Sequence, residues 1–296
     1  MIKTPQQIIE LIINAKSYVD VFENLDNYDI TFTEYIKLIH PDLCKLPNAN
    51  DATVKLNKFK TDIEKGKVYK DDAGIVTYFP FYCIMEGNSD LLRKSLSNYQ
   101  MLLKFNSTDD LHFHKYLPKE MKMENDKLKI SFEHRAVPLS SIKILPQEHV
   151  NWVLSRLLEI IGWLEQKGYC HAGINLDSVY IVPETHGIIL TSFYHLTKEG
   201  QNLKTISGRY KSFYPHVVFI QKTAGSFIDI ELSKRVAAFL LGDTSGNGTV
   251  LRKTHNIDFI NFLLTYDVKK SSFHIFKEYR NMLQKNFEKK FHKLNI

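Results

Sequence analysis

The sequence is short of several features that would place a protein in a special class. Its 296 residues include three cysteines, Cys44, Cys83 and Cys170, which are far apart and odd in number, so they predict neither a disulfide framework nor a zinc site. No run approaches the roughly 18 consecutive apolar residues of a membrane-spanning helix. The first residues interrupt apolar positions with Gln, Glu, Asn and Lys, unlike a signal peptide. We therefore expect a cytoplasmic protein with no membrane partner.

A strong charge of one sign is also missing. The chain has 39 basic and 33 acidic residues and a net charge of +6, a bias too small to indicate a nucleic-acid partner. The densest basic stretch, residues 286–294, predicts the solvated face of a terminal helix, with Phe287, Phe291 and Leu294 packed inward. Hydrophobic residues make up 44% of the chain and charged residues 24%, which is typical of a folded globular protein.

No glycine-rich phosphate loop is recognisable. The stretch 242–254 contains several glycines, but its spacing differs from that of a P-loop and Lys253 lies too far along, so we expect a surface loop. His112 and His114 would share one face of a strand, yet no third ligand stands near them. We therefore predict no metal site and no cofactor.

The first part of the chain has the periodicity of helices. A short helix and a loop are expected in the first 25 residues. Apolar residues then recur at three-to-four spacing after Asp29 and again over residues 51–65. The tripeptide His40-Pro41-Asp42 separates these two predicted helices, because the residue before a proline avoids helical geometry.

From Val68 the pattern changes to short apolar runs typical of strands, at residues 74–85, 111–117 and 127–132. One predicted helix, at 90–105, interrupts them. After residue 138 the chain becomes mostly helical. Three helices are predicted there, at residues 146–167, 229–241 and 272–294. Strands followed by helices are typical of an α+β fold with two lobes.

Residues 168–195, GYCHAGINLDSVYIVPETHGIILTSFYH, resemble the catalytic segment of protein kinases, in which His-Arg-Asp, Leu-Lys-Pro-x-Asn, a β-hairpin and Asp-Phe-Gly follow one another. The run 127–142 resembles the kinase linker between lobes. The run 226–243 resembles the buried helix whose leading aspartate, here Asp229, anchors the catalytic-loop backbone. The resemblance covers residue 68 to the end and implies a two-lobed kinase-like fold.

The side chains that transfer phosphate in that family are replaced. A kinase needs a base for the hydroxyl, carboxylate and amide ligands for magnesium, and a strand lysine on the phosphates. The resemblance implies that the positions of the catalytic Asp, the loop Asn, the metal-binding Asp and the strand Lys are here Gly173, Ser178, Ser192 and Met85. His171 keeps its place and is expected to be structural. The resemblance therefore implies a pseudokinase, not an active enzyme.

Residues 32–66 resemble a J domain, the co-chaperone module that stimulates a DnaK-type ATPase. In that family His-Pro-Asp lies in the loop between two antiparallel helices. The resemblance implies that a chaperone would be bound through His40, Pro41 and Asp42, together with Lys37 on the preceding helix. Leu43 stands where a lysine usually follows.

The two resemblances divide the chain into a J-like helical region at residues 1–67, a kinase-like β-rich lobe at 68–136 and a helical lobe at 137–296. The layout is similar to that of J-domain and kinase-like fusion proteins of bacteria and their phages, which implies the cytosol of a bacterium or of an infected host. We expect a binding or scaffold protein that engages a chaperone. Two alternatives remain open: an atypical kinase or nucleotide-dependent transferase using Asp177 or Glu184, and a structural or virion-associated protein.

Overall fold

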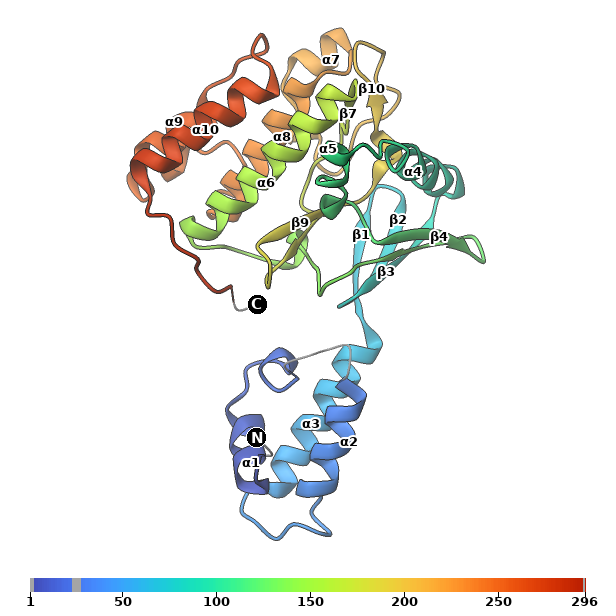
Figure 1. Cartoon of the computed structure of the whole chain (residues 1–296), viewed down its shortest axis with the longest axis vertical. Coiled ribbons are helices and arrows are strands. Elements are labelled where there is room, and N and C mark those ends of the chain that lie inside the picture. The colour runs from blue at the N-terminus through green and yellow to red at the C-terminus, as the bar shows by residue number, and fades with distance from the viewer. Residues whose placement is uncertain (1–2, 23–27, 295) are drawn as a thin grey trace. The chain divides into compact units, whose positions relative to one another are not determined.

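The structure is a computed structural model of the whole chain, and it describes residues 3–22, 28–294 and 296. It is a mixed α+β fold with an antiparallel sheet (Figure 1), as the sequence predicts at that level. The chain divides into two compact units. The smaller unit contains the residues up to Val68 with 77–80 and Ile296, and the larger contains 69–76 and 81–295.

Three helices that contact one another form the smaller unit: α1 (Pro5–Asn14), α2 (Tyr28–Ile39) and α3 (Ala49–Lys65). α1 begins at a capping box in which the side chains of Thr4 and Gln7 each accept a bond from the other's backbone N–H. The predicted helices at 29–39 and 51–65 are confirmed within about two residues. The predicted loop after α1 lies partly outside the described residues, at 23–27.

The core of the smaller unit consists of apolar side chains from all three helices. Ile8 and Ile12 of α1, Ile39 of α2 and Leu56 of α3 are almost completely buried. The hydroxyl of Thr53 on α3 donates to the carbonyl of Ile39 at 3.2 Å. This bond satisfies one of the carbonyls that a helix end leaves without an internal partner.

The sheet of five strands has the order β1-β2-β3-β5-β4. The strands are β1 (Lys67–Asp71), β2 (Gly74–Phe79), β3 (Tyr82–Gly87), β4 (Glu120–Glu124) and β5 (Lys127–Ser131). Helix α4 (Ser89–Leu102) packs against β3, β4 and β5. The predicted strands at 74–85 and 127–132 and the predicted helix at 90–105 are confirmed, whereas β4 was not predicted.

The third predicted strand, at residues 111–117, is wrong. The segment contains the end of helix α5 (Thr108–Leu111) and the 3-10 turn η3 (His114–Tyr116). The cause is a buried polar contact that periodicity cannot show. Asp110 accepts from the indole N–H of Trp163 at 2.8 Å and pairs with Lys167 at 2.6 Å. His112 and His114 therefore do not share a strand face.

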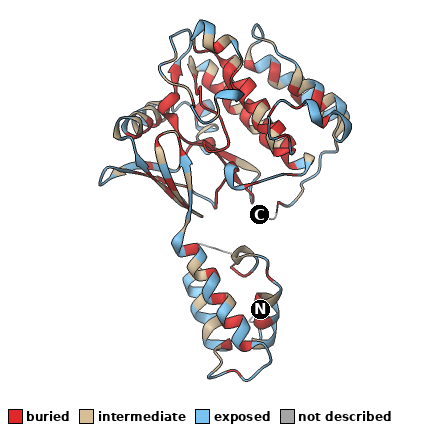
Figure 2. Ribbon diagram, turned by 180° about the vertical axis from the view of Figure 1, so that it is seen from behind, coloured by how far each residue is buried: buried red, intermediate tan, exposed pale blue. Residues whose placement is uncertain are grey.

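Helices dominate the rest of the larger unit. They are α6 (Gln147–Gln166), α7 (Val217–Gln221), α8 (Ser226–Leu240), α9 (Ile257–Leu264) and α10 (Ser272–Asn286). α6 packs against α8 and α10, and most residues of α6 and α8 are buried (Figure 2). The predicted helices at 146–167 and 229–241 are confirmed. No helix in the described part of the chain combines the length and the apolar character that crossing a membrane requires.

The predicted terminal helix is too long. α10 ends at Asn286, and Phe287 has extended backbone angles. Beyond it, the ring of Phe291 stacks on His186 with centroids 4.0 Å apart, and the His186 ring nitrogen Nε2 donates to the carbonyl of His292 at 2.8 Å. Leu294 is buried, but Phe291 is 63% exposed. Contacts with a distant hairpin thus replace the helix that the local pattern predicted.

Short strands complete the larger unit. β8 (Val179–Val182) pairs with β9 (Gly187–Leu190) as a hairpin, and β6 (Val137–Pro138) pairs with the outer side of β8. β7 (Tyr169–Cys170) pairs with β10 (Thr197–Lys198). The candidate site, described below, includes the loop between β7 and β8 and the segment after β9.

Candidate functional site

The loop between β7 and β8 is anchored by a carboxylate on α8. Asp229 accepts the backbone N–H of His171 at 2.6 Å and that of Ala172 at 2.8 Å. Burial raises the pKa of Asp229 to about 7, although the two backbone N–H groups act in the opposite direction. Ala172 has φ +57°, a left-handed conformation that is uncommon for a residue with a side chain. The anchor holds this strained turn in place.

The loop then closes on itself through short polar side chains. The hydroxyl of Ser178 donates to the carbonyl of Gly173 at 2.9 Å and accepts from the N–H of Asn175 at 2.9 Å. The amide oxygen of Asn175 accepts the N–H groups of Asp177 and Ser178 at 2.8 and 3.0 Å. Ser178 is therefore buried and engaged with its own loop.

His171 lies completely buried beneath this loop. Its Nε2 lies 2.9 Å from the carbonyl of Thr191, so this nitrogen carries the proton. Burial lowers the pKa of His171 to about 4. The ring is thus neutral at physiological pH and links the loop to the segment after β9.

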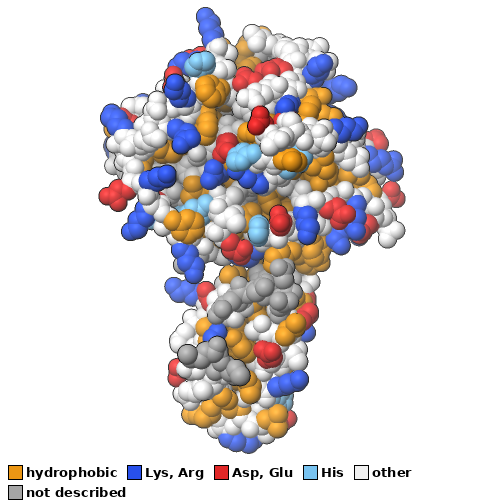
Figure 3. Space-filling model, viewed as in Figure 1, with side chains coloured by type: hydrophobic (Ala, Val, Ile, Leu, Met, Phe, Trp, Pro, Cys, Tyr) orange, Lys and Arg blue, Asp and Glu red, His pale blue; other side chains and the backbone are white. Residues whose placement is uncertain are grey.

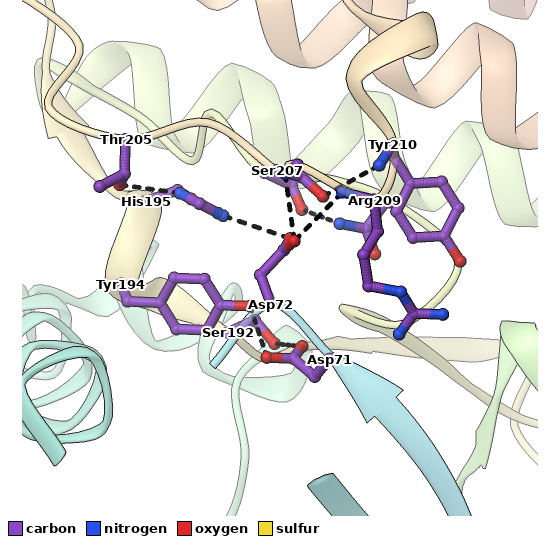
Figure 4. A network of polar contacts seen from close by, with 12 residues as sticks. Asp71, Asp72, Ser192, Tyr194, His195, Thr205, Ser207, Arg209 and Tyr210 are labelled. Carbon is purple, nitrogen blue, oxygen red and sulfur yellow. Dashed lines mark hydrogen bonds and ion pairs between the residues drawn. The ribbon is translucent and has the colours of Figure 1, made fainter. Parts of the chain in front are cut away.

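Two consecutive aspartates at the end of β1 point into the site in different directions (Figure 4). The buried carboxylate of Asp71 accepts from the hydroxyl of Ser192 at 2.9 Å, the phenol of Tyr194 at 2.6 Å and the N–H of Ala73 at 2.8 Å. Burial raises its pKa even though these three bonds oppose the shift. The hydroxyl of Ser192 is therefore already bonded to the carboxylate of Asp71.

Asp72 is directed toward the segment around residues 205–210 (Figure 4). Its carboxylate accepts the N–H groups of Gly208 and Arg209 at 3.1 and 3.2 Å. Nε2 of His195 lies 3.6 Å away, within ion-pair distance but too far for a hydrogen bond. Burial alone would raise the pKa of Asp72, but the contacts with His195, Ser207 and the Arg209 backbone lower it. The turn between β1 and β2 is thus bound to two segments more than 120 positions away.

Asp177 is a buried carboxylate with a raised pKa, a property that is enriched at functional sites. Its side chain is 3% exposed, one oxygen pairs with the guanidinium of Arg209 at 3.0 Å, and the other has no hydrogen-bond partner. Burial raises the pKa of Asp177 to about 6, against the opposing effect of Arg209. Glu184, by contrast, is exposed in the turn between β8 and β9.

Large side chains are buried around the site. Met85 is buried, and so are Phe193 and Tyr194 from the segment after β9. Tyr180 of β8 is also buried; its hydroxyl contacts Cys83 of β3 at 3.4 Å and the hydroxyl of Tyr69. These contacts join the sheet to the β8–β9 hairpin through apolar and aromatic groups.

The tripeptide His40-Pro41-Asp42 lies in the loop between α2 and α3. Nδ1 of His40 accepts the N–H of Asp42 at 3.3 Å, and the Asp42 carboxylate is 86% exposed. Lys37 is exposed on α2. Leu43 is 77% exposed, and apolar side chains gather at the end of the smaller unit that carries this loop (Figure 3). The loop therefore presents a carboxylate and an apolar side chain to solvent.

Sequence reasoning missed Asp71, Asp72, His195 and Arg209. The only local signal was the pair of aspartates before Ala73-Gly74, which reads as an ordinary turn. Pairing that turn with residues 192–210 requires the tertiary structure. Among the described residues, no three His, Cys, Asp or Glu side chains are grouped as metal ligands.

Comparison with known proteins adds no relative to this picture: no protein-family model matches the chain, and no curated protein matches it in sequence.

Proposed function

We propose that the chain is a binding or scaffold protein without phosphoryl-transfer activity. In this proposal the larger unit has the kinase-like arrangement that the sequence resemblance implies, and the smaller unit engages a DnaK-type chaperone. The protein would then act in the cytoplasm of a bacterium or of a phage-infected host. The observation that carries the proposal is the hydrogen-bonded group of Asp71, Ser192 and Tyr194, because it closes the position where the resemblance would place bound magnesium.

Three positions support the absence of catalysis. The residue at the implied base position, Gly173, has no side chain, and the imidazole of His195 takes the space beside it. Ser192 at the implied metal position donates to Asp71. Met85 at the implied lysine position is a buried thioether. Loss of a general base alone costs about 10²- to 10⁴-fold in rate, and loss of the magnesium ligand also removes the neutralisation of phosphate charge.

Nucleotide binding provides the test of this half of the proposal. Thermal unfolding is measured with and without millimolar ATP and magnesium, beside an assay of phosphate transfer to a generic protein substrate. We expect no change in the unfolding midpoint, since a ligand that does not bind the folded state cannot stabilise it. A rise of several degrees that requires magnesium, together with phosphate transfer, would overturn the proposal.

The chaperone half rests on the exposed Asp42 carboxylate in a loop between two packed helices. Purified protein is mixed with a DnaK-type chaperone, and ATP hydrolysis is measured. We expect the rate to rise and the rise to disappear in Asp42→Asn, because the amide keeps the shape and removes the charge. An unchanged rate, or an equal rise with the variant, would refute the interaction.

One observation favours a second candidate, an enzyme that uses Asp177. A buried carboxylate with a pKa of about 6 and an oxygen without a partner has the properties of a general base. Glu184 has no comparable support, because it is exposed. If phosphate transfer is found, Asp177→Asn should abolish it and Glu184→Gln should not. The reverse result would exclude Asp177.

A further inference from the structure

A cavity of about 550 Å³ lies in the larger unit, between the β8–β9 hairpin and residues 114–119. Apolar side chains form part of its wall, among them Leu103, Leu117, Val182 and Ile189. The volume falls within the range of about 300–1,000 Å³ that is usual for small-molecule sites. It is separate from the network of Asp71 and Asp72, none of whose residues lines it. The cavity therefore has the size and the mixed wall of a binding site.

Basic side chains predominate among the polar groups of the wall. Lys115, Lys119, Arg156, His114, His134 and His186 all line the cavity. Glu133 is the one acidic residue among the described lining residues. The wall thus carries three permanent positive charges against one negative charge.

A single carboxylate outside the lining is shared by several of these groups. Glu159 pairs with Arg156 at 2.9 Å and lies 4.0 Å from Lys115. It also accepts from the phenol of Tyr116 at 2.7 Å and contacts His112 at 3.0 Å. One negative charge cannot neutralise both Arg156 and Lys115. An excess of positive charge therefore remains on this side of the cavity.

The basic groups are close enough to affect one another. Burial lowers the pKa of Lys115; Glu159 opposes this shift, and the nearby Arg156 adds to it. Burial also lowers the pKa of His186; the bond to the carbonyl of His292 opposes this shift, and the charges of Arg156 and His292 add to it. Positive charges held together in this way at a partly buried wall are stabilised when an anion binds between them.

We propose that this cavity binds a small phosphate-bearing molecule with an apolar body. The phosphate would lie against Lys115, Lys119 and Arg156, and the apolar body against Leu117 and Ile189. A guanidinium and ammonium groups together suit a dianionic phosphate, since the guanidinium can form two parallel bonds and lysine supplies point charges. Such a ligand should bind more tightly than inorganic phosphate, because only its apolar body can contact the apolar part of the wall.

The probe for this site is phenyl phosphate, which joins a dianion to an apolar ring. Isothermal titration of the full chain compares phenyl phosphate, inorganic phosphate and benzyl alcohol, which lacks the charge. We expect phenyl phosphate to bind at least about tenfold more tightly than either of the other two, because each uses only half of the site. The affinity should fall as salt concentration rises.

Two charge-removing variants separate this site from general surface charge. Lys119→Gln should weaken phenyl phosphate binding about tenfold, the loss expected for one charge-assisted bond. Lys143→Gln removes an exposed lysine that does not line the cavity and should leave binding unchanged. The unfolding midpoints of both variants should match that of the parent, which shows that any loss reflects the site.

Three outcomes of these titrations would overturn the proposal. They are no measurable binding of phenyl phosphate at millimolar concentration, equal weakening by the two variants, and equal binding of benzyl alcohol. A short phosphotyrosine peptide forms a further arm. If the peptide binds more than about tenfold more tightly than phenyl phosphate, the partner is a phosphorylated protein and the assignment to a small molecule is wrong. The result does not depend on whether the chain engages a chaperone or binds ATP.

Discussion

The imidazole of His195 lies against the α-carbon of Gly173. A Cβ added at Gly173 would come within 2.5 Å of Cδ2 of His195, and the Cγ and Cβ atoms of the same side chain would both lie at 3.1 Å. Gly173 does not have a positive φ, so its backbone would accept a side chain. The restriction is therefore purely one of space, and the occupant is a buried ring.

Gly173→Ala is expected to destabilise the fold. The added methyl group must displace His195, which is held by Thr205 at 2.9 Å, and forcing extra atoms into a packed site costs about 1–3 kcal/mol. The free energy of unfolding by urea measures the effect. Gly162→Ala is the matched control, because Gly162 lies in α6 with no atom within 4 Å of an added Cβ. It should stabilise the protein by up to about 1 kcal/mol.

The contact itself can be isolated with a double-mutant cycle. If His195 is the obstacle, the cost of Gly173→Ala should become much smaller in a His195→Ala background. A cost that is the same in both backgrounds would mean that something other than the ring restricts position 173. Gly173→Asp should be at least as destabilising as Gly173→Ala and should not create phosphate transfer.

Tyr194→Phe should weaken the network around Asp71. The phenol of Tyr194 is 1% exposed and donates to the Asp71 carboxylate at 2.6 Å. Its removal leaves a buried carboxylate with one donor fewer, which costs about 1–3 kcal/mol. Tyr266→Phe, at a side chain that is 47% exposed, should change the unfolding free energy by less than about 0.5 kcal/mol. Equal effects would show that the hydrogen bond contributes nothing.

The sequence predicts elements whose patterns are local. The apolar stripe of α6, including Val150, Leu157 and Leu164, is buried as its spacing indicates. In an amphipathic helix the spacing of the apolar residues identifies the face that packs inward. The strands at 74–85 and 127–132 are likewise indicated by short local runs of apolar residues. The local pattern does not indicate the conformation of the segment at 111–117, because the contacts of Asp110 with Trp163 and Lys167 lie outside that segment.

The candidate site was only partly predictable for a similar reason. Gly173, Ser178 and Ser192 could be singled out only through the sequence resemblance to protein kinases. Asp71 and Asp72 could not, since a pair of aspartates in a turn carries no sign of a partner 120 residues away. The contact of Phe291 with His186 was missed for the same reason, and the helix at 272–294 was predicted to continue through it. Long-range polar contacts leave little trace in one sequence.

The raised pKa of Asp177 makes stability depend on pH. Because its folded pKa, about 6, lies above the ordinary aspartate value of 3.8, the folded state holds the proton more tightly than the unfolded state. Its favourable contribution is complete below pH 4 and is lost as the pH rises to about 6 and above. Asp177→Asn cannot ionise. Its unfolding free energy should therefore rise relative to the parent between pH 4 and 7, by no more than about 3 kcal/mol.

Chemical denaturation at several pH values measures this difference. Asp267→Asn is the control, because the bond from the backbone N–H of Lys269 lowers the pKa of Asp267 and outweighs the opposing effect of burial. Relative to the parent, it should show no gain over the same range. If the difference in unfolding free energy between Asp177→Asn and the parent does not change with pH, Arg209 neutralises the carboxylate fully and the pKa of Asp177 is not raised.

The segment after α10 should loosen in mild acid. The His186 ring lies between Trp152 and Phe291, with ring centroids 4.7 and 4.0 Å away, and His149 lies 6.0 Å from it. Burial lowers the pKa of His149 and of His186. Since both folded values lie below the unfolded one, their contribution to stability is complete above about pH 6.5 and is lost as the pH falls.

The charged groups that face this cluster act mostly in the same direction. The charges of Arg156 and His292 disfavour a proton on His186, whereas the carbonyl of His292, which accepts from its Nε2, favours one. Among the charged groups, Glu148 alone favours a proton on His149. Hydrogen exchange of residues 287–294, followed by mass spectrometry at pH 7.5 and 5.5 and corrected for the intrinsic rate, should show protection that is lost at the lower pH. Phe291→Ala should lose it at both values, because the stack on His186 is gone. His186→Gln should make exchange less dependent on pH. If protection in the parent is the same at both pH values, protonation of these histidines does not release the segment.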